Sequence, residues 1–388
     1  MTSADPRSTR WAWAEIDEDA IRENVALLVR QVAPAAAWAI VKADGYGHGA
    51  LTAARAALEG GATGLGVALA QEGIELRAAG IVAPPVLVLS QQPVEHFAAM
   101  VEHALTPTLY DLDAIAAFGA AVRNAGRTDV GVHLKFDTGM RRVGAQPSAA
   151  VALADAVRSE APALRLEGVF THLAVADEPT DPTTTEQLAR FDAVLTDLRS
   201  AGHEPELVHA ANSAGAVAHP HGRRDLVRLG IAIYGIEPGP GVAELCTGLR
   251  PAMRLVARAG LVKPVAAGDR ISYGLRHRFE QDSVVATVPI GYADGVPRRL
   301  FAAGGEVLVG GRRRPIVGVV TMDQLMVDCG PVGDPVADAV RVGDEVVLLG
   351  SQGAERIRPE EWADRLGTIA YEIVCGISHR IQRHPLRR

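Results

Sequence analysis

The chain has few cysteines, few aromatic residues and no long apolar run. Its three cysteines are odd in number and far apart in a chain of 388 residues, at Cys246, Cys329 and Cys375. This usage favours reduced thiols over a disulfide framework or a zinc site. The apolar run at residues 81–89 is short and interrupted by prolines, and residues 1–7 lack the apolar core of a signal peptide. These absences predict a cytoplasmic protein with no membrane partner and no bound metal.

Charge is also scarce. Only 22% of the residues are charged and the formal net charge is −7, so the sequence offers no basic surface for nucleic acid. Two short basic runs, at residues 312–314 and 387–388, are expected to form a hairpin tip and a solvated tail. His219 and His221 flank a proline and have no apparent third ligand, which argues against a metal site.

Apolar residues, in contrast, are plentiful. They make up 48% of a chain that is longer than one hydrophobic core usually serves, so we expect two domains. In the first, short continuous apolar runs are typical of strands buried on both faces. Helical spacing separates them, for example from Leu188 to Leu198. The eight expected strands cover residues 38–42, 64–68, 85–90, 106–110, 130–136, 166–173, 207–212 and 226–230.

This alternation predicts an α/β fold whose N-terminal part, residues 10–245, is a closed (β/α)8 barrel of the TIM type. After about Gly248 the pattern changes to short valine-rich segments separated by Gly, Pro and Asp. It predicts a mostly β C-terminal domain, residues 246–388, which closes with a helix that begins at Pro359. Its expected strands cover residues 253–262, 283–289, 306–309, 316–320, 325–329 and 345–349.

Reactive side chains fall at or near the carboxyl ends of the expected barrel strands, where barrel enzymes place their active sites. They are Lys42, Lys135, His172 and Arg228. An amine at the end of a buried strand loses hydration, so its pKa falls and it becomes a nucleophile toward carbonyls. The glycine-rich loop after Lys42, and the residues Ser213, Gly230 and Ile231 after the last two strands, offer donors suited to a phosphate.

Eight motifs together resemble the alanine racemase family, which comprises pyridoxal-phosphate enzymes of fold type III. They lie at residues 41–49, 135–144, 170–174, 227–235, 272–274, 291–295, 322–324 and 371–372, so the resemblance spans nearly the whole chain. Two positions depart from the family pattern. Asp44 stands where the family often has Asn, and Arg141 where it often has Gly.

The resemblance implies pyridoxal 5′-phosphate as the cofactor, held by Lys42 as an imine. Arg228 would face the pyridine nitrogen, and because a guanidinium only donates hydrogen bonds, that nitrogen would stay unprotonated. This arrangement favours return of a proton to Cα over transamination. The full set of cofactor contacts implied is Lys42, Tyr46, His172, Asn212, Ser213, Arg228, Gly230, Ile231 and Tyr371.

The resemblance also implies two catalytic bases, Lys42 and Tyr273, one for each face of the substrate Cα. Tyr273 would come from the partner subunit, so that a homodimer shares its active sites. Arg142 and the backbone N–H of Met322 would hold the carboxylate of a small amino acid, and Lys135 would be carbamylated. The reaction implied is the interconversion of L-alanine and D-alanine, which supplies D-alanine for peptidoglycan.

Three alternatives remain. A fold-type III decarboxylase shares this architecture but resembles a design in which an acidic residue faces the pyridine nitrogen, so Arg228 argues against it. A non-enzymatic cofactor carrier typically lacks a second domain, so the β domain with Tyr273 argues against it. A racemase of serine or lysine is the hardest to exclude. We predict alanine, because Tyr273, Tyr292 and Tyr371 would crowd the pocket entry and admit only a small side chain.

Overall fold

The computed structural model describes residues 10–387, which fall into two compact units. The barrel unit comprises residues 20–45 and 50–250, and the β unit comprises residues 10–19, 46–49 and 251–387. The expectations about residues 1–7 and about Arg388 lie outside the described part of the chain. No helix among residues 10–387 combines the length and the apolar character needed to span a bilayer.

Eight parallel strands form the barrel unit. They pair in the orders β4-β3-β2-β9 and β5-β6-β7-β8. A bridge between Leu87 and Thr106 joins β4 to β5, and the backbone bond from Asp225 N to Val208 O, at 3.1 Å, joins β9 to β8. The ring is therefore closed in sequence order, which confirms the predicted barrel. The strands are β2 (Ala36–Ile40), β3 (Gly64–Val67), β4 (Val86–Val88), β5 (Thr108–Leu109), β6 (Val130–Lys135), β7 (Leu164–Phe170), β8 (Leu207–His209) and β9 (Leu226–Leu229).

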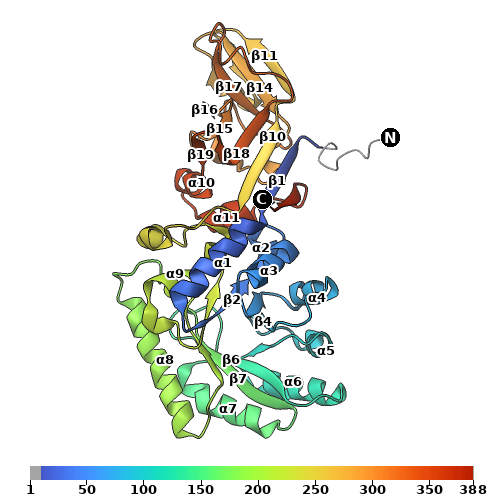
Figure 1. Cartoon of the computed structure of the whole chain (residues 1–388), viewed down its shortest axis with the longest axis vertical. Helices are drawn as coiled ribbons and strands as arrows, with labels where there is room; N and C mark the ends of the chain where they lie inside the picture. Colours follow the sequence, from blue (N-terminus) through green and yellow to red (C-terminus); the bar gives the residue numbers. More distant parts are fainter. Residues whose placement is uncertain (1–9, 388) are drawn as a thin grey trace. The chain divides into compact units, whose positions relative to one another are not determined.

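Helices surround this ring, and Figure 1 shows α6, α7 and α8 around β6 and β7. The predicted apolar stripe of α8 is buried, from Leu188 to Leu198, and α6 is capped by Asp111, whose side chain accepts from Ala114 N at 2.7 Å. The helices are α1 (Glu18–Val32), α3 (Ala50–Glu59), α4 (Ala70–Ala78), α5 (Phe97–Glu102), α6 (Leu112–Asn124), α7 (Ala150–Ser159), α8 (Thr183–Ser200) and α9 (Ser213–Ala218).

The β unit contains two sheets and a short ribbon. One sheet has the order β16-β15-β18-β10-β1-β20 with β19 on β18, the other has the order β11-β14-β17, and β12 pairs with β13. The strands are β1 (Ala12–Asp17), β10 (Met253–Arg258), β11 (Leu261–Val265), β12 (Arg270–Ile271), β13 (His277–Arg278), β14 (Ser283–Val288), β15 (Glu306–Val309), β16 (Arg312–Pro315), β17 (Leu325–Pro331), β18 (Glu345–Gln352), β19 (Glu355–Ile357) and β20 (Gln382–Leu386). The helices are α10 (Pro359–Leu366) and α11 (Ala370–Cys375), and Pro359 opens the first of them as predicted.

Short 3₁₀ helices join many of these elements. They are η2 (Val94–His96), η3 (Pro147–Ala149), η4 (Pro220–Gly222), η5 (Ile231–Tyr234), η6 (Pro240–Cys246), η7 (Tyr273–Leu275), η8 (Tyr292–Asp294) and η9 (Arg298–Leu300). Because η5, η7 and η8 contain predicted site residues, the candidate functional groups lie largely on connections and strand ends.

Three expectations about the β unit are wrong. Residues 312–314 are not a hairpin tip but lie in strand β16, where Arg313 is 2.8 Å from Glu361, 3.1 Å from Glu355 and 3.4 Å from Glu306. Because these three carboxylates offset the charge of Arg313, the basic run can lie within a sheet. The run at 253–262 is two strands, β10 and β11, and residues 316–320 form only one isolated bridge, at Ile316.

Candidate functional site

The segment after β2 forms a left-handed turn that begins at Lys42. Lys42 is not the last strand residue as expected, because β2 ends at Ile40. It opens α2 (Lys42–Tyr46), in which residues 43–46 all have φ between 51° and 61°. A left-handed backbone costs about 1–2 kcal/mol per non-glycine residue, so the surrounding structure must hold this turn in place.

Two carboxylates hold the Lys42 turn. Glu72, on α4, accepts backbone hydrogen bonds from Ala43 N at 2.6 Å and from Ala68 N at 2.8 Å. Asp44, inside the turn, accepts from Ala50 N at 2.8 Å, where α3 begins. These bonds satisfy three backbone donors, one in the turn, one just after β3 and one at the start of α3, and they tie the turn to its neighbours.

Lys135 is a nearly buried amine at the end of β6. It is 4% exposed, and its Nζ donates to the carbonyl of Leu89 at 3.2 Å. Loss of hydration, followed by the nearby charges of Arg228, Arg142 and Lys42, lowers the pKa of Lys135 to about 7. A large fraction of this amine is therefore uncharged near neutral pH.

Arg228, on β9, is the buried cation of the barrel interior and is 3% exposed. Its Nη2 donates to the carbonyls of Thr171 at 2.8 Å and Ala210 at 2.9 Å, and its Nη1 lies 2.6 Å from His209 Nδ1. Burial lowers the pKa of Arg228 to about 9, so the guanidinium keeps its charge near neutral pH.

His172 lies on the loop after β7, and its Nδ1 is 3.3 Å from Arg228 Nη2. Burial and the charge of Arg228 hold the pKa of His172 well below its ordinary value. Because Arg228 can only donate, Nδ1 accepts and the proton of the neutral ring sits on Nε2. Buried Gln187 fixes the backbone here, donating to His172 O at 3.0 Å and accepting from Ala174 N at 2.8 Å.

Arg142 lines a small pocket together with Lys135 and His172. The loop that carries it is held by Asp137, whose Oδ1 accepts from Gly139 N at 2.9 Å and from Arg141 N at 3.0 Å. Arg141 itself has a φ of 58°, the backbone conformation that glycine adopts most easily. The pocket is lined by Lys135, Phe136, Asp137, Met140, Arg142, Val143, Thr171 and His172. The structure therefore brings Lys135, Arg142 and His172 together.

Ser213, Gly230 and Ile231 lie together where α9 and η5 begin. Ser213 Oγ accepts from Gly230 N at 2.8 Å, and Ile231 is the first residue of η5. The side-chain oxygen of Asn212 caps α9 by accepting from Gly215 N at 2.9 Å. The side-chain oxygen of Asn212 therefore stabilises the start of α9.

Tyr46 and Tyr371 are paired in the β unit. Their ring centroids are 6.1 Å apart, and burial, followed by the interaction with Tyr371, raises the pKa of Tyr46, so its hydroxyl stays protonated. A Cβ on Gly47 would lie 2.2 Å from the carbonyl oxygen of Val374 on α11. Only glycine permits this approach between the segment after Lys42 and the helix of Tyr371.

Tyr273, Tyr292 and Met322 form the exposed part of the candidate site, with 73%, 41% and 52% of their surfaces accessible. Backbone bonds from Tyr292 N to Thr321 O at 2.9 Å and from Ala293 N to Met322 O at 3.0 Å join the loops of Tyr292 and Met322. Large exposed apolar and aromatic side chains commonly mark a contact surface. The groove beside Tyr273 is lined by Lys263, Ile271, Ser272, Tyr273, Gly274, Thr287, Thr321, Gln324 and Met326.

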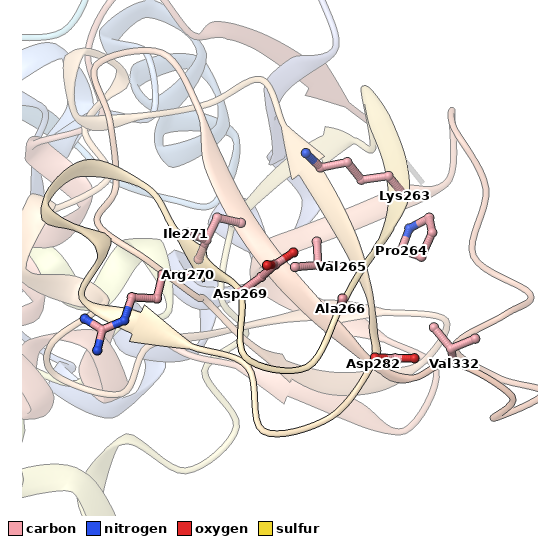
Figure 2. Close-up of a pocket in the computed structure, with 9 residues that line it drawn as sticks. All are labelled: Lys263, Pro264, Val265, Ala266, Asp269, Arg270, Ile271, Asp282 and Val332. Carbon is pink, nitrogen blue, oxygen red and sulfur yellow. The ribbon is translucent and has the colours of Figure 1, made fainter.

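A neighbouring pocket, drawn in Figure 2, contains no predicted site residue. It shares Lys263 and Ile271 with the groove of Tyr273. Its charges are balanced, since Lys263 and Arg270 accompany Asp269 and Asp282, so it is not suited to hold an anion. Among residues 10–387, no group of three His, Cys, Asp or Glu side chains could hold a metal ion.

Our sequence analysis missed four polar residues around the site. Glu72 holds the Lys42 turn, and His209, His133 and Glu167 extend inward from Arg228. One signal was present in the sequence. His133 alternates with Lys135 on a strand that is otherwise apolar near its end, which places both side chains on the same face.

Comparisons with known proteins cover both units. Residues 16–238 match the alanine racemase N-terminal domain family and residues 252–385 match the C-terminal domain family. A curated alanine racemase from Symbiobacterium thermophilum is 48% identical over 374 residues, 96% of this chain and 97% of that protein. The solved alanine racemase from Streptomyces coelicolor is 38% identical with a TM-score of 0.92, covering 99% of this chain and 100% of that one. A histidine racemase from Leuconostoc mesenteroides is 28% identical with a TM-score of 0.89, covering 98% and 99%.

Proposed function

Because this chain belongs to the alanine racemase family over nearly its full length, we propose that it interconverts L-alanine and D-alanine with pyridoxal 5′-phosphate. The observation that carries the proposal is Arg228, a buried cation within 3.3 Å of His172. A guanidinium can only donate to a ring nitrogen, so the nitrogen stays unprotonated and the cofactor withdraws fewer electrons. This limited withdrawal suits proton exchange at Cα better than transamination.

The donor groups of the chain fit this cofactor. An amine at a strained turn, a donor-only cation, and hydroxyl and backbone N–H groups match its aldehyde, ring nitrogen and phosphate. When bound, the cofactor supplies the electron withdrawal that makes the Cα hydrogen acidic. In our proposal, Lys42 holds it covalently, Arg228 donates to the ring, and the remaining contacts come from Tyr46, His172, Asn212, Ser213, Gly230, Ile231 and Tyr371.

Two residues exchange the proton at Cα in this proposal. Lys42 serves one face, and Tyr273 of the partner subunit serves the other. A tyrosine with an ordinary pKa of about 10 is a weak base near neutrality. His172, a neutral ring with its proton on Nε2, can donate to the Tyr273 oxygen, and the charge of Arg228 behind it favours the phenolate.

Lys135 is proposed to carry a carbamate. The reaction requires an uncharged amine, whose nitrogen bonds to the carbon of CO₂ and then loses a proton. Burial and neighbouring cations hold Lys135 close to that state by lowering its pKa to about 7. The product is an anion among the charges of Arg228, Arg142 and Lys42, which favour it. It would neutralise the cluster and orient Arg142 toward a substrate carboxylate.

The proposal requires a homodimer. Residues 10–245 would supply every proposed cofactor contact except Tyr371. Residues 246–388 would deliver Tyr273 and the Met322 N–H to the partner subunit, where Met322 joins Arg142 at the substrate carboxylate. The exposure of Tyr273 and Met322, 73% and 52%, supports this use, because neither side chain is covered by its own described chain.

We place this activity in the cytoplasm, where it would supply D-alanine for peptidoglycan. None of Cys246, Cys329 and Cys375 forms a disulfide in the described part of the chain, which supports a reducing compartment.

Alanine is the proposed substrate, and a decarboxylase is not favoured, because the relatives compared above, which match nearly the whole chain, are named racemases. The fold also occurs in a histidine racemase at 28% identity, so the backbone alone does not select the side chain. The higher identity to an alanine racemase, 48%, supports the small substrate.

The test uses the purified protein with its cofactor and a panel of amino acids in deuterated solvent. We expect the Cα hydrogen of alanine to exchange fastest. Faster exchange with serine, lysine or histidine would contradict the choice of alanine. Borohydride reduction followed by peptide mapping should then place the cofactor on Lys42, and a Lys42→Ala protein should carry no label. A label on another lysine would contradict the assignment.

A further inference from the structure

A line of buried polar side chains crosses the inside of the barrel from Arg228 to Glu167. Arg228 Nη1 lies 2.6 Å from His209 Nδ1, and His209 Nε2 lies 2.9 Å from His133 Nδ1. His133 Nε2 in turn lies 3.4 Å from Glu167 Oε2. Both histidines are 0% exposed. The side chains come from β9, β8, β6 and β7, so the line joins four of the eight barrel strands.

The chemistry of the two ends sets the direction of every hydrogen bond between them. A guanidinium only donates and a carboxylate only accepts. Because Arg228 donates to His209 Nδ1, the proton of the neutral His209 ring must sit on Nε2, and Nε2–H donates to His133 Nδ1. The His133 proton must then also sit on Nε2 and point at Glu167. His133 Nε2 makes no hydrogen bond of standard geometry among the described residues, and Glu167 Oε2, 3.4 Å away, is the carboxylate that faces it.

The charges along this line agree with the direction of its hydrogen bonds, which runs from Arg228 to Glu167. Burial lowers the pKa of His133, and burial with the charge of Arg228 holds the pKa of His209 well below its ordinary value. The hydrogen bond from His133 is the main cause that lowers the pKa of Glu167. A cation and an anion therefore stand at the two ends, with two neutral rings between them whose N–H dipoles all point toward the anion.

The backbone is shaped to admit these side chains. The pairing of β6 with β7 shifts register between Val132 and His133, and such a bulge lets the consecutive residues Glu167 and Gly168 both approach the same ring. A Cβ on Gly168 would lie 2.5 Å from His133 Cε1, and a Cβ on Gly131 would lie 2.6 Å from the Glu167 carboxylate. The two glycines thus leave the space that His133 and Glu167 occupy.

Aromatic rings surround the two histidines. Phe170 stacks on His209, with ring centroids 4.6 Å apart and planes 8° apart, and Trp38 lies 5.9 Å from the His133 ring. All four rings belong to nearly or fully buried residues. A water-poor setting strengthens each polar interaction in the line and penalises any tautomer that leaves a donor facing a donor.

We propose that Glu167 is a positioning residue for Arg228, acting through His133 and His209 as its remote counter-ion and fixing the orientation of its guanidinium. The role at the cofactor ring rests on the proposed function, whereas the hydrogen-bond chain itself does not. With both tautomers fixed, Nη1 has one acceptor inside the barrel, while Nη2 donates to the carbonyls of Thr171 and Ala210, just beyond the carboxyl ends of β7 and β8. Outer partners of this kind orient a functional group without touching the substrate.

The first test measures the tautomers in the wild-type holoenzyme labelled with ¹⁵N-histidine. Long-range proton–nitrogen correlation spectra distinguish a protonated Nε2 from a protonated Nδ1, and the variants His133→Asn and His209→Asn assign the two rings by loss of signal. We expect both rings to be neutral with the proton on Nε2 at neutral pH. A charged ring, or a proton on Nδ1 of either residue, would overturn the proposal whether or not the protein racemises alanine.

The second test compares Glu167→Gln, which removes the charge and keeps an acceptor, with Glu206→Gln. Glu206 is a matched control because it lies 2.8 Å from Arg165, which also binds Glu167 at 2.9 Å. We expect Glu167→Gln to lower kcat about tenfold with little change in KM. The His133 Nε2–H resonance should move upfield, because a hydrogen bond to an amide is weaker than one to a carboxylate.

Glu206→Gln should change neither kcat nor the His133 resonance. Equal effects of the two variants, or an unchanged resonance and kcat in Glu167→Gln, would overturn the proposal. If Glu167→Gln does not fold, the wild-type tautomers alone decide. A wild-type protein that fails to racemise alanine would refute the proposed function and leave the tautomer result standing.

Discussion

The turn that carries Lys42 and the turn that carries Tyr273 are both left-handed, but their surroundings differ. In the Lys42 turn, residues 43–46 have positive φ, and carboxylates accept from the backbone N–H groups of that turn and of the start of α3. In the Tyr273 turn, Ser272 and Leu275 have φ values of 67° and 49°. Ser272 Oγ donates to Val319 O at 2.7 Å.

The side chains differ more than the backbones. Lys42 is half-buried within a group of cations that influences Lys135, whereas Tyr273 is 73% exposed. Among residues 10–387 the Tyr273 side chain forms no hydrogen bond. A strained turn that is held firmly but presents an uncovered side chain supports the proposal that Tyr273 acts in the partner subunit. In the proposed mechanism, Lys42 would therefore act within its own subunit, and Tyr273 would act in a neighbouring subunit.

The largest expected effect comes from removing one of the two proposed bases. Tyr273→Phe should slow removal of the Cα proton from L-alanine by about 10²–10⁴-fold, the range for loss of a general base, while the cofactor stays bound through Lys42. The measurement is deuterium exchange of each enantiomer, with cofactor absorbance as a check. An unchanged rate with L-alanine would remove Tyr273 from the mechanism.

Mixing subunits sharpens the same comparison. Tyr273→Phe and Lys42→Ala proteins should each be inactive alone, whereas hybrid dimers should regain one working site, because that site combines an intact Lys42 with an intact Tyr273. Continued inactivity of hybrids whose formation is verified by mass spectrometry would show that the sites are not shared.

A second effect concerns Lys135, whose amine interacts with the charge of Lys42. The folded state lowers the pKa of Lys135 from 10.5 to about 7, so between these values the unfolded chain binds more protons. The free energy of unfolding should therefore rise with pH from about 7 to about 10, by on the order of a few kcal/mol, with the penalty complete below about 7. Urea unfolding in CO₂-free buffer at several pH values measures this.

Lys135→Met is the control and should flatten that pH dependence. An equal slope in both proteins would mean that Lys135 is not the group responsible. Added bicarbonate should stabilise the wild type alone if the carbamate forms, and it should leave Lys135→Met unchanged.

A smaller effect tests the support of the Tyr273 turn. Gly318 has a φ of 70°, and a Cβ there would lie 2.6 Å from Ser272 Cβ. Gly318→Ala should cost about 1–3 kcal/mol of stability and should also lower kcat by displacing Tyr273. Gly310→Ala is matched, because its φ is 61° and nothing lies within 4 Å of an added Cβ. Equal kcat values for the two variants would show that Gly318 does not position Tyr273.

The smallest effect concerns the Lys42 turn itself. Asp44→Asn keeps an oxygen that can accept from Ala50 N, and Asn tolerates left-handed backbone well. Its stability should therefore stay within about 0.5 kcal/mol of the wild type. Asp44→Ala loses the acceptor and should cost about 1–2 kcal/mol. Thermal unfolding of both variants measures the difference, and equal values would mean that the Asp44 carboxylate does not hold the turn.

Much of the fold was predictable because burial on both faces of a parallel strand demands a continuous apolar run. All eight barrel strands were placed in this way. Their ends were less predictable, as at Lys42, because a left-handed turn depends on distant acceptors such as Glu72. Strand β16 was missed because its arginines look solvated until Glu306, Glu355 and Glu361 lie beside them.

The sequence by itself determined the strand–helix alternation, the change to short β segments and the residue types at the barrel rim, because each depends on neighbours a few positions apart. Only the tertiary structure decided that Lys135 is nearly buried among cations, and that Arg228, His209, His133 and Glu167 form one directed line. Those residues are far apart in the chain. Their protonation states follow from hydration lost and partners gained when the barrel closes.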